Sequence, residues 1–125
     1  MRQIIAMGGD GFSMEPENLA FEDCSTDSLP GEYQVLACLG YLAGSFCPHY
    51  DGEPERRLSY QKLIGQGALR GGLAAEDGTA VHFTDEKLVR VVSSRPNAKA
   101  YRVVRINDQV QEEALESHYL ENTHT

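Results

Sequence analysis

Short apolar runs separated by turn-forming residues fill the second half of the chain. Four of these runs predict β-strands, at residues 72–75, 80–83, 88–92 and 100–106. The sequences D-G, T-D-E and S-R-P-N stand among them, and residues of these types are common in tight turns. A further run at residues 110–115 predicts an edge strand. Antiparallel β-structure is therefore expected over most of the stretch from residue 72 to residue 115.

The first half of the chain mixes strand, loop and helix patterns. Residues 2–7 predict a buried strand, because they form an apolar run with two β-branched members. Residues 13–19 begin with a serine followed by acidic residues, which predicts a short helix. Residues 23–31 have the composition of a loop, and residues 33–42 fit either a short helix or a strand.

A second helix is expected after Glu53-Pro54-Glu55, since proline fits a first helical turn and acidic residues suit the positive end of the helix dipole. Its apolar side can be formed by Leu58, Tyr60, Leu63 and Ile64. Gly65 and Gly67 are expected to end it.

The strand at residues 2–7 runs into the glycine loop Gly8-Gly9-Asp10-Gly11. This order is typical of an open α/β sheet, in which ligands lie beyond the carboxyl ends of the strands. The loop could bring its backbone close to a substrate, and a tight turn that needs positive φ explains the glycines equally well. Without G-x-G-x-x-G or G-K-[ST], the loop predicts no dinucleotide or nucleotide cofactor.

His49 follows directly on an apolar run that ends at Cys47-Pro48. We expect this histidine where a strand gives way to a loop, which is a common place for catalytic side chains. The ordinary pKa of imidazole lies near neutrality, so His49 is a candidate proton carrier. An ordinary hydrogen-bonded loop histidine has the same sequence signature, and the choice depends on its neighbours.

Length, charge and cysteine content exclude several classes of function. The 125 residues suffice for one domain, and a net charge of −8 from 11 basic and 19 acidic residues argues against nucleic-acid and membrane partners. Three cysteines without a C-x-x-C pair fit a reducing compartment. Cys47 and His49 lack a second ligand pair, so no metal site is expected. The apolar stretch near Met1 is shorter than a signal or spanning segment, and we expect a cytoplasmic protein.

Four stretches of the chain together resemble the dipeptidase E family of aspartyl dipeptidase-type serine peptidases. They are R-Q-I-I-A-M-G-G-x-G-F-S-M-E near the N-terminus, T-D-S at residues 26–28, C-P-H-Y-D-G-E-P-E-R-R at residues 47–57 and A-E-D-G-T-A-V-H-F at residues 75–83. The resemblance covers nearly the whole chain. It implies a fold similar to that of class I glutamine amidotransferases. It also implies an enzyme that hydrolyses small and Asp-containing peptides without a cofactor.

The resemblance also implies a fold class and a domain. The chain would be α/β, a remnant of a three-layer α/β/α sandwich with a mostly parallel sheet, followed by C-terminal antiparallel strands. Residues 1–120 would form one peptidase-like domain, and residues 121–125 a flexible tail.

Catalytic roles follow from the same resemblance. His49 would be the base, Asp77 the carboxylate that orients it, with Glu76 as the adjacent alternative, and Asp27 a further aspartate near the site. Gly8, Gly9 and Gly11 would form the substrate loop. A neutral histidine base needs an acceptor on its far nitrogen to fix the tautomer, which agrees with the implied acid.

The chain departs from the family pattern where the nucleophile should be. It contains neither a G-x-S-A-G nucleophile elbow nor a G-G-G-N loop, and it passes from Asn18-Leu19 to Phe21-Glu22, which indicates an internal shortening near residues 19–22. Asp10 also stands where the family usually has glycine. The hydroxyls and thiols that remain nearby are those of Ser13, Cys24, Ser25, Ser28 and Cys47, and none lies on an elbow.

Two hypotheses follow from this departure. The chain is either a peptidase that uses an unrecognised nucleophile or a non-catalytic variant that has lost activity and acts by binding or self-association. Loss of central strands would expose sheet edges, which favours a homodimer formed through them. We expect a family member whose hydrolytic activity is lost.

Overall fold

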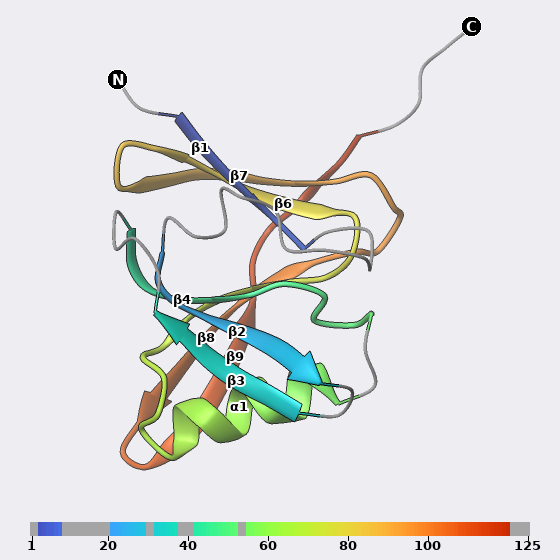
Figure 1. Ribbon diagram of the computed structural model, residues 1–125. Coiled ribbons are helices and arrows are strands. Elements are labelled where there is room, and N and C mark those ends of the chain that lie inside the picture. The colour runs from blue at the N-terminus through green and yellow to red at the C-terminus, as the bar shows by residue number, and fades with distance from the viewer. Residues whose placement is uncertain (1–2, 9–20, 30–31, 38–41, 53–54, 121–125) are drawn as a thin grey trace, which may run out of the picture.

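The computed structural model describes residues 3–8, 21–29, 32–37, 42–52 and 55–120, and of residues 21–29 and 32–37 it describes the backbone. These residues form two mixed sheets and a helix (Figure 1). In chain order the elements are β1 Gln3–Met7, β2 Phe21–Leu29, β3 Glu32–Ala37, β4 Leu42–Cys47, α1 Arg56–Gly65, β5 Gly72–Ala75, β6 Thr79–Thr84, β7 Lys87–Ser93, β8 Ala100–Ile106, β9 Gln109–Ala114 and β10 His118–Tyr119.

The two sheets contain both parallel and antiparallel pairs. The smaller sheet has the order β1-β6-β7-β10, and the larger has the order β3-β2-β4-β5-β8-β9. Parallel pairing joins β2 to β4, β4 to β5 and β7 to β10, and the other neighbours are antiparallel. The described part of the chain is thus a mixed α and β structure, in which a mostly parallel sheet is not confirmed.

The larger sheet has a hydrophobic core on each of its faces. On one face Phe46 and Leu73 pack with Val81 and other residues of the smaller sheet. On the other face Ala74 packs with Tyr60 and other residues of α1. Successive side chains of a strand point to opposite faces, so one central strand supplies both cores. Figure 1 accordingly shows α1 and the smaller sheet on opposite sides of the larger sheet.

The strands expected after residue 72 are confirmed. β5 and β8 have the bounds that the apolar runs predict, while β6 and β7 are slightly longer. β9 is confirmed as an edge strand of the larger sheet. The two-residue strand β10 had no signal in the sequence, because its pairing with β7 is too short to require a hydrophobic pattern.

The structure corrects one expectation for the first half of the chain and decides another that the sequence left open. Residues 23–29 are not a loop but part of β2, whose backbone pairs with β3 on one side and β4 on the other. The ambiguous run after residue 32 is strand β3. Tertiary pairing overrides the weak strand propensity of short polar residues, which explains the wrong prediction. The expected helix at residues 13–19 and tail at residues 121–125 lie outside the described residues.

Helix α1 begins and ends close to where the sequence predicts. Tyr60 and Ile64 are buried as expected, but Leu58 is 70% exposed and Arg56 is buried in its place. The long aliphatic stem of arginine can cover apolar surface, so a hydrophobicity pattern misses this exchange. Within the described ranges, no helix is long and apolar enough to cross a membrane.

A polar cluster attaches the segment after His49 to α1 and β9. Its centre is the carboxylate of Glu112, which accepts a hydrogen bond of 2.5 Å from the Tyr50 hydroxyl and one of 2.7 Å from Gln61 Nε2. Arg57 also donates to Glu112, with its Nε at 3.0 Å. Burial, together with the hydrogen bond to Glu112, raises the pKa of Tyr50 well above its ordinary value of 10.0.

Replacing Tyr50 with phenylalanine tests this attachment. Tyr50→Phe should lower the free energy of unfolding by about 1 kcal/mol at neutral pH, because a buried hydroxyl bond is lost. The raised pKa of Tyr50 favours the folded state fully below about pH 10, and this contribution is lost as the pH rises further. The native chain should therefore lose stability above that pH more steeply than Tyr50→Phe in urea unfolding. Tyr119→Phe, at an exposed position, is the control, and equal slopes for native and Tyr50→Phe chains would contradict this prediction.

Candidate active site

His49 lies just beyond the end of β4, as the sequence predicts. Its φ of 55° is in the left-handed region, which is uncommon for a residue other than glycine. The His49 N–H donates to the Gly8 carbonyl at 2.8 Å, and the next N–H, of Tyr50, donates to Ala75 at 3.0 Å. A turn bond of 3.1 Å joins the Gly52 N–H to the His49 carbonyl. These bonds fix the direction in which the imidazole leaves the chain.

The imidazole of His49 is hydrogen-bonded to a carboxylate. Its Nδ1 lies 2.9 Å from Oδ1 of Asp77, in the turn between β5 and β6. His49 is 5% exposed, and the Asp77 side chain is 22% exposed. Because an ionised carboxylate only accepts hydrogen bonds, Nδ1 is the donor. In neutral His49 this leaves Nε2 as a proton acceptor, which is the tautomer that a general base requires.

Glu76 was the alternative partner for His49, and its side chain has a different contact. Its Oε1 accepts the N–H of Lys99 at 2.7 Å, and its own N–H donates to the Lys99 carbonyl at 3.0 Å. Of the two neighbouring acids, Asp77 is the one in contact with His49. The Glu76 carboxylate therefore binds the backbone of Lys99, and the Asp77 carboxylate is the one placed to orient the imidazole.

Two residues that sequence reasoning missed hold the backbone of Asp77. Oδ1 of Asp51 accepts the Asp77 N–H at 2.8 Å, and Nε of Arg95 donates to the Asp77 carbonyl at 2.7 Å. Arg95 and Asp51 also form an ion pair of 2.8 Å, which raises the pKa of the Arg95 guanidinium. Asp51 stands two residues from His49, a possible signal, whereas Arg95 was assigned only to a turn. Asp51, Arg95 and Asp77 thus form a closed ring of hydrogen bonds, which passes through the N–H and the carbonyl of Asp77.

Glycines at two positions near this pair allow close contact with the Glu76–Asp77 turn, at Gly8 with backbone and at Gly52 with a side chain. A Cβ atom on Gly8 would lie 2.0 Å from the Glu76 carbonyl oxygen, and one on Gly52 would lie 2.1 Å from Oδ2 of Asp77. Gly8, one of the three glycines expected in the substrate loop, therefore supports the site through its backbone. The other two, Gly9 and Gly11, lie outside the described residues.

Asp27 lies in β2, of which the backbone is described. β2 and β4 run parallel, with Cys24 opposite Phe46, and Asp27 and His49 each come three residues later. The two residues therefore lie toward the same end of these strands. The role of Asp27 stays a prediction.

The hydroxyls and thiols considered as substitute nucleophiles find little support in the structure. Ser13 lies outside the described residues, and Cys24, Ser25 and Ser28 lie in β2. The thiol of Cys47 is fully buried in the core against α1, and it approaches the Pro48 carbonyl at 3.5 Å. In the part of the chain that the structure describes, no hydroxyl or thiol is hydrogen-bonded to Nε2 of His49. No group of three His, Cys, Asp or Glu side chains suited to a metal ion occurs there either.

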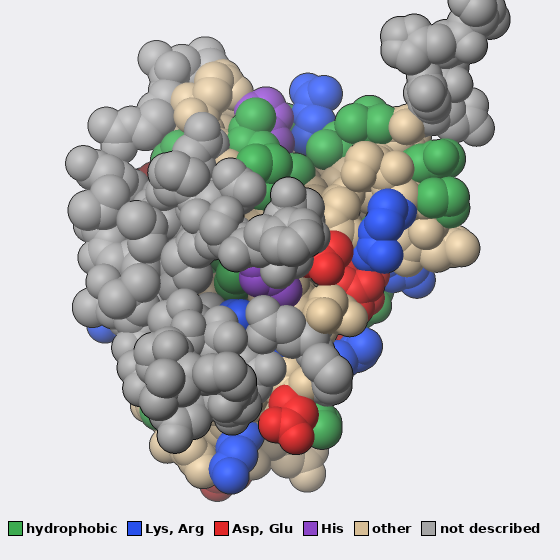
Figure 2. All heavy atoms as spheres, turned by 45° about the vertical axis from the view of Figure 1, so that its right-hand side comes forward, with side chains coloured by type: hydrophobic (Ala, Val, Ile, Leu, Met, Phe, Trp, Pro, Cys, Tyr) green, Lys and Arg blue, Asp and Glu red, His purple; other side chains and the backbone are tan. Residues whose placement is uncertain are grey.

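The surface around this region is mixed in charge. Figure 2 shows a histidine and acidic side chains close together in the middle of one face, with basic side chains beside them. The ring of Asp51, Arg95 and Asp77 supplies both signs. An imidazole held by a carboxylate can exchange a proton with a molecule that reaches its other nitrogen.

Substitution of the two neighbouring acids tests which of them sets the histidine tautomer. In Asp77→Asn the amide can donate to Nδ1, so the fraction of neutral His49 protonated at Nδ1 should fall substantially in imidazole ¹⁵N NMR spectra. Glu76→Gln, one position away, should leave that fraction unchanged. The opposite pattern would show that Glu76 orients the ring in solution.

Gly52→Ala tests whether the close contact with Asp77 matters. The added methyl group overlaps Oδ2 of Asp77, so the carboxylate should move away from His49 and the Nδ1–H signal should weaken as in Asp77→Asn. Gly52 is exposed, and the free energy of unfolding should change by about 0.5 kcal/mol or less. An unchanged His49 spectrum would contradict the prediction. Gly65→Ala, whose Cβ would meet Val110 at 3.2 Å, is the control.

Comparison with known proteins gives a consistent result. Residues 5–91 match the model of peptidase family S51. The chain is 49% identical over 100 residues to the uncharacterized peptidase YgaJ of Bacillus subtilis (strain 168), a match that covers 80% of this chain and 43% of the relative. The chain thus spans less than half the length of that relative. No solved structure matches the chain. The long match to the family model, which includes both His49 and Asp77, shows that this chain belongs to peptidase family S51.

Proposed function

We propose that this chain keeps the proton-transfer half of a serine-type peptidase site and does not hydrolyse peptides by itself. The observation that carries the proposal is the bond between His49 Nδ1 and Asp77, 2.9 Å long. It leaves Nε2 of the neutral ring as a base, as in the histidine of a catalytic triad. Among the described residues, however, no hydroxyl or thiol is hydrogen-bonded to Nε2, so this base has no nucleophile to activate there.

The absent elbow supports the loss of activity. The 125 residues contain no G-x-S-x-G sequence, so the strained turn that exposes a serine and aligns oxyanion donors is not encoded in them. A triad that loses its nucleophile typically keeps only the small rate enhancement supplied by binding and oxyanion groups. We infer that His49 and Asp77, with Asp27 nearby, are what remains of a site for small and Asp-containing peptides.

The complete family domain would have a different architecture around this site. We propose that it is a three-layer α/β/α sandwich related to class I glutamine amidotransferases, with a mostly parallel sheet. The parallel strands β2, β4 and β5 are the part of this chain that fits such a sheet. We also propose a cytoplasmic location, from the odd number of cysteines and the lack of a C-x-x-C pair.

The alternative function is a binding or self-associating scaffold. It is favoured by the position of β3 and β9 at the two ends of the larger sheet, because strands at a sheet edge can pair with another chain. A homodimer formed in this way would need neither His49 nor Asp77.

An assay with a chromogenic aspartyl substrate and a fluorophosphonate probe tests whether the chain is active. The native chain should neither release the chromophore from aspartyl p-nitroanilide nor react with the probe above the level of His49→Ala, because no activated serine is available. A characterised serine peptidase is the positive control for both reagents. Turnover that His49→Ala abolishes would refute the proposed loss of activity and reveal an unrecognised nucleophile.

A further inference from the structure

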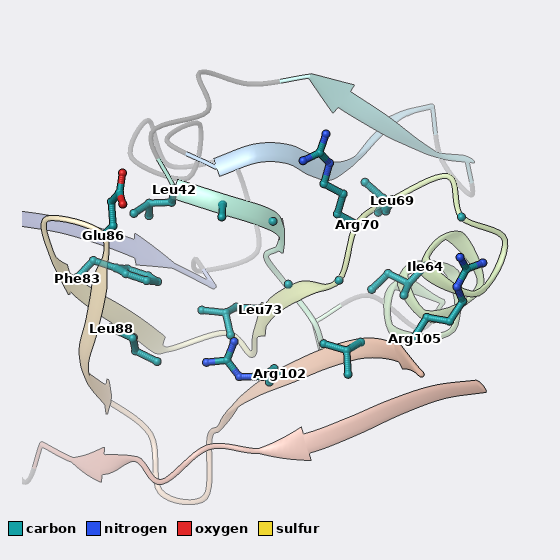
Figure 3. A pocket seen from close by; sticks show the side chains of 16 residues that line it. Leu42, Ile64, Leu69, Arg70, Leu73, Phe83, Glu86, Leu88, Arg102 and Arg105 are labelled. Atoms are coloured by element: carbon teal, nitrogen blue, oxygen red, sulfur yellow. The ribbon is translucent and has the colours of Figure 1, made fainter. Parts of the chain in front are cut away.

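A pocket lies at the opposite end of the strands that present His49 and Asp77. It is a cavity of about 820 Å³, within the roughly 300–1,000 Å³ range of small-molecule sites. Its walls include the first residues of β4 and β5, the loop before β5, the turn between β6 and β7, and part of β8 (Figure 3). Because β4 and β5 run parallel, this cavity is at their amino ends and the His49–Asp77 pair is beyond their carboxyl ends.

The floor of the cavity is apolar and rigidly held. Leu42, Leu73 and Phe83 line it, and each belongs to the core between the two sheets with at most 6% of its surface exposed. Leu88 and Val104 are half-buried at its border, so they can still cover an apolar ligand. Such a floor binds an apolar body without rearrangement of the core.

The polar groups of the cavity are mainly cationic. Arg70, Arg102 and Arg105 line it and are exposed, and Glu86 is the acidic residue among the described lining residues. Three of the 11 basic residues of a chain with net charge −8 therefore gather at one cavity. The local charge thus opposes the charge of the whole chain, which favours an anionic ligand at this place.

Arg102 is the best placed of the three. It stands opposite Leu73 in the register of β5 and β8, and Figure 3 shows its side chain extending towards Leu73 and Leu88. Arg105 is partly engaged, since Nη1 lies 3.5 Å from the Gly65 carbonyl. In the described part of the chain no carboxylate forms an ion pair with Arg102, including its cross-strand neighbour Glu113. Its guanidinium can therefore bind a carboxylate with two parallel hydrogen bonds.

We propose that this cavity binds a small carboxylate with an apolar body, with the carboxylate on Arg102 and the apolar part over Leu73 and Leu88. A single negative charge fits better than several, because Glu86 also lines the cavity. A fatty acid and the carboxyl end of an apolar dipeptide share this chemistry. The site is independent of the proposed proton transfer at His49.

Titration with octanoate, followed by calorimetry and by amide NMR shifts, tests the proposal. Saturable binding should shift signals of Leu73, Leu88 and Val104 and leave those of His49 unchanged. Arg102→Gln should weaken binding by about tenfold or more. Arg90→Gln removes the same charge from an exposed position outside the cavity and should change affinity by about twofold or less. Octanamide, which is neutral, should bind the native chain about tenfold more weakly than octanoate.

A blocked cavity gives a second, charge-independent measurement. Ala43 is exposed at the rim, so Ala43→Phe should fill part of the entrance and abolish octanoate binding while circular dichroism stays native. Tighter binding of acetylated dileucine than of octanoate would identify a peptide end as the ligand source, and the reverse order a fatty acid. No saturable binding, equal weakening by both arginine substitutions, or equal affinity for octanoate and octanamide would each overturn the proposal.

Discussion

The parallel pairing of β4 with β5 is the constraint on which both ends of the molecule depend. Ser45, Phe46 and Cys47 face Gly72, Leu73 and Ala74 in register, so the segments that follow the two strands emerge side by side. The strands are so close that a Cβ on Gly72 would lie 1.9 Å from the Ser45 carbonyl oxygen. Any larger residue at position 72 would push the strands apart. The meeting of His49 and Asp77 therefore depends on a glycine at the other end of β5.

The His49–Asp77 pair is maintained by the backbone around it. A non-glycine residue at positive φ costs about 1–3 kcal/mol, and the surrounding hydrogen bonds must offset it. The Gly8 carbonyl accepts the His49 N–H, and the Ala75 carbonyl accepts the N–H of the next residue, Tyr50. The backbone of Asp77 is held separately by hydrogen bonds with Asp51 and Arg95. None of these contacts involves a nucleophile. The contact between His49 and Asp77 therefore does not depend on an attacking residue, and it occurs in a chain whose sequence contains no G-x-S-x-G motif.

The sequence predicts elements well where local patterns decide the structure. The strands after residue 72 alternate apolar residues with turn signals, and their bounds are close to those observed. β2 could not be predicted, because its polar sequence becomes a strand only through pairing with β3 and β4. The position of His49 follows from the end of an apolar run, but the choice between Glu76 and Asp77 depends on the course of one turn. The bond between Arg95 and Asp51 joins residues 44 positions apart, and no local pattern indicates it.

The two ends of β4 and β5 differ in their electrostatic character, which bears on how they could act together. At the carboxyl ends Asp77 contacts the imidazole, Asp51 holds the Asp77 N–H, and Arg95 forms an ion pair with Asp51. An anionic ligand therefore gains little at this end of the strands. At the amino ends Arg102 meets an apolar floor without an ion-pair partner among the described residues. A carboxylate would therefore be drawn to the end of the sheet away from His49, and binding it there would leave the His49–Asp77 contact undisturbed.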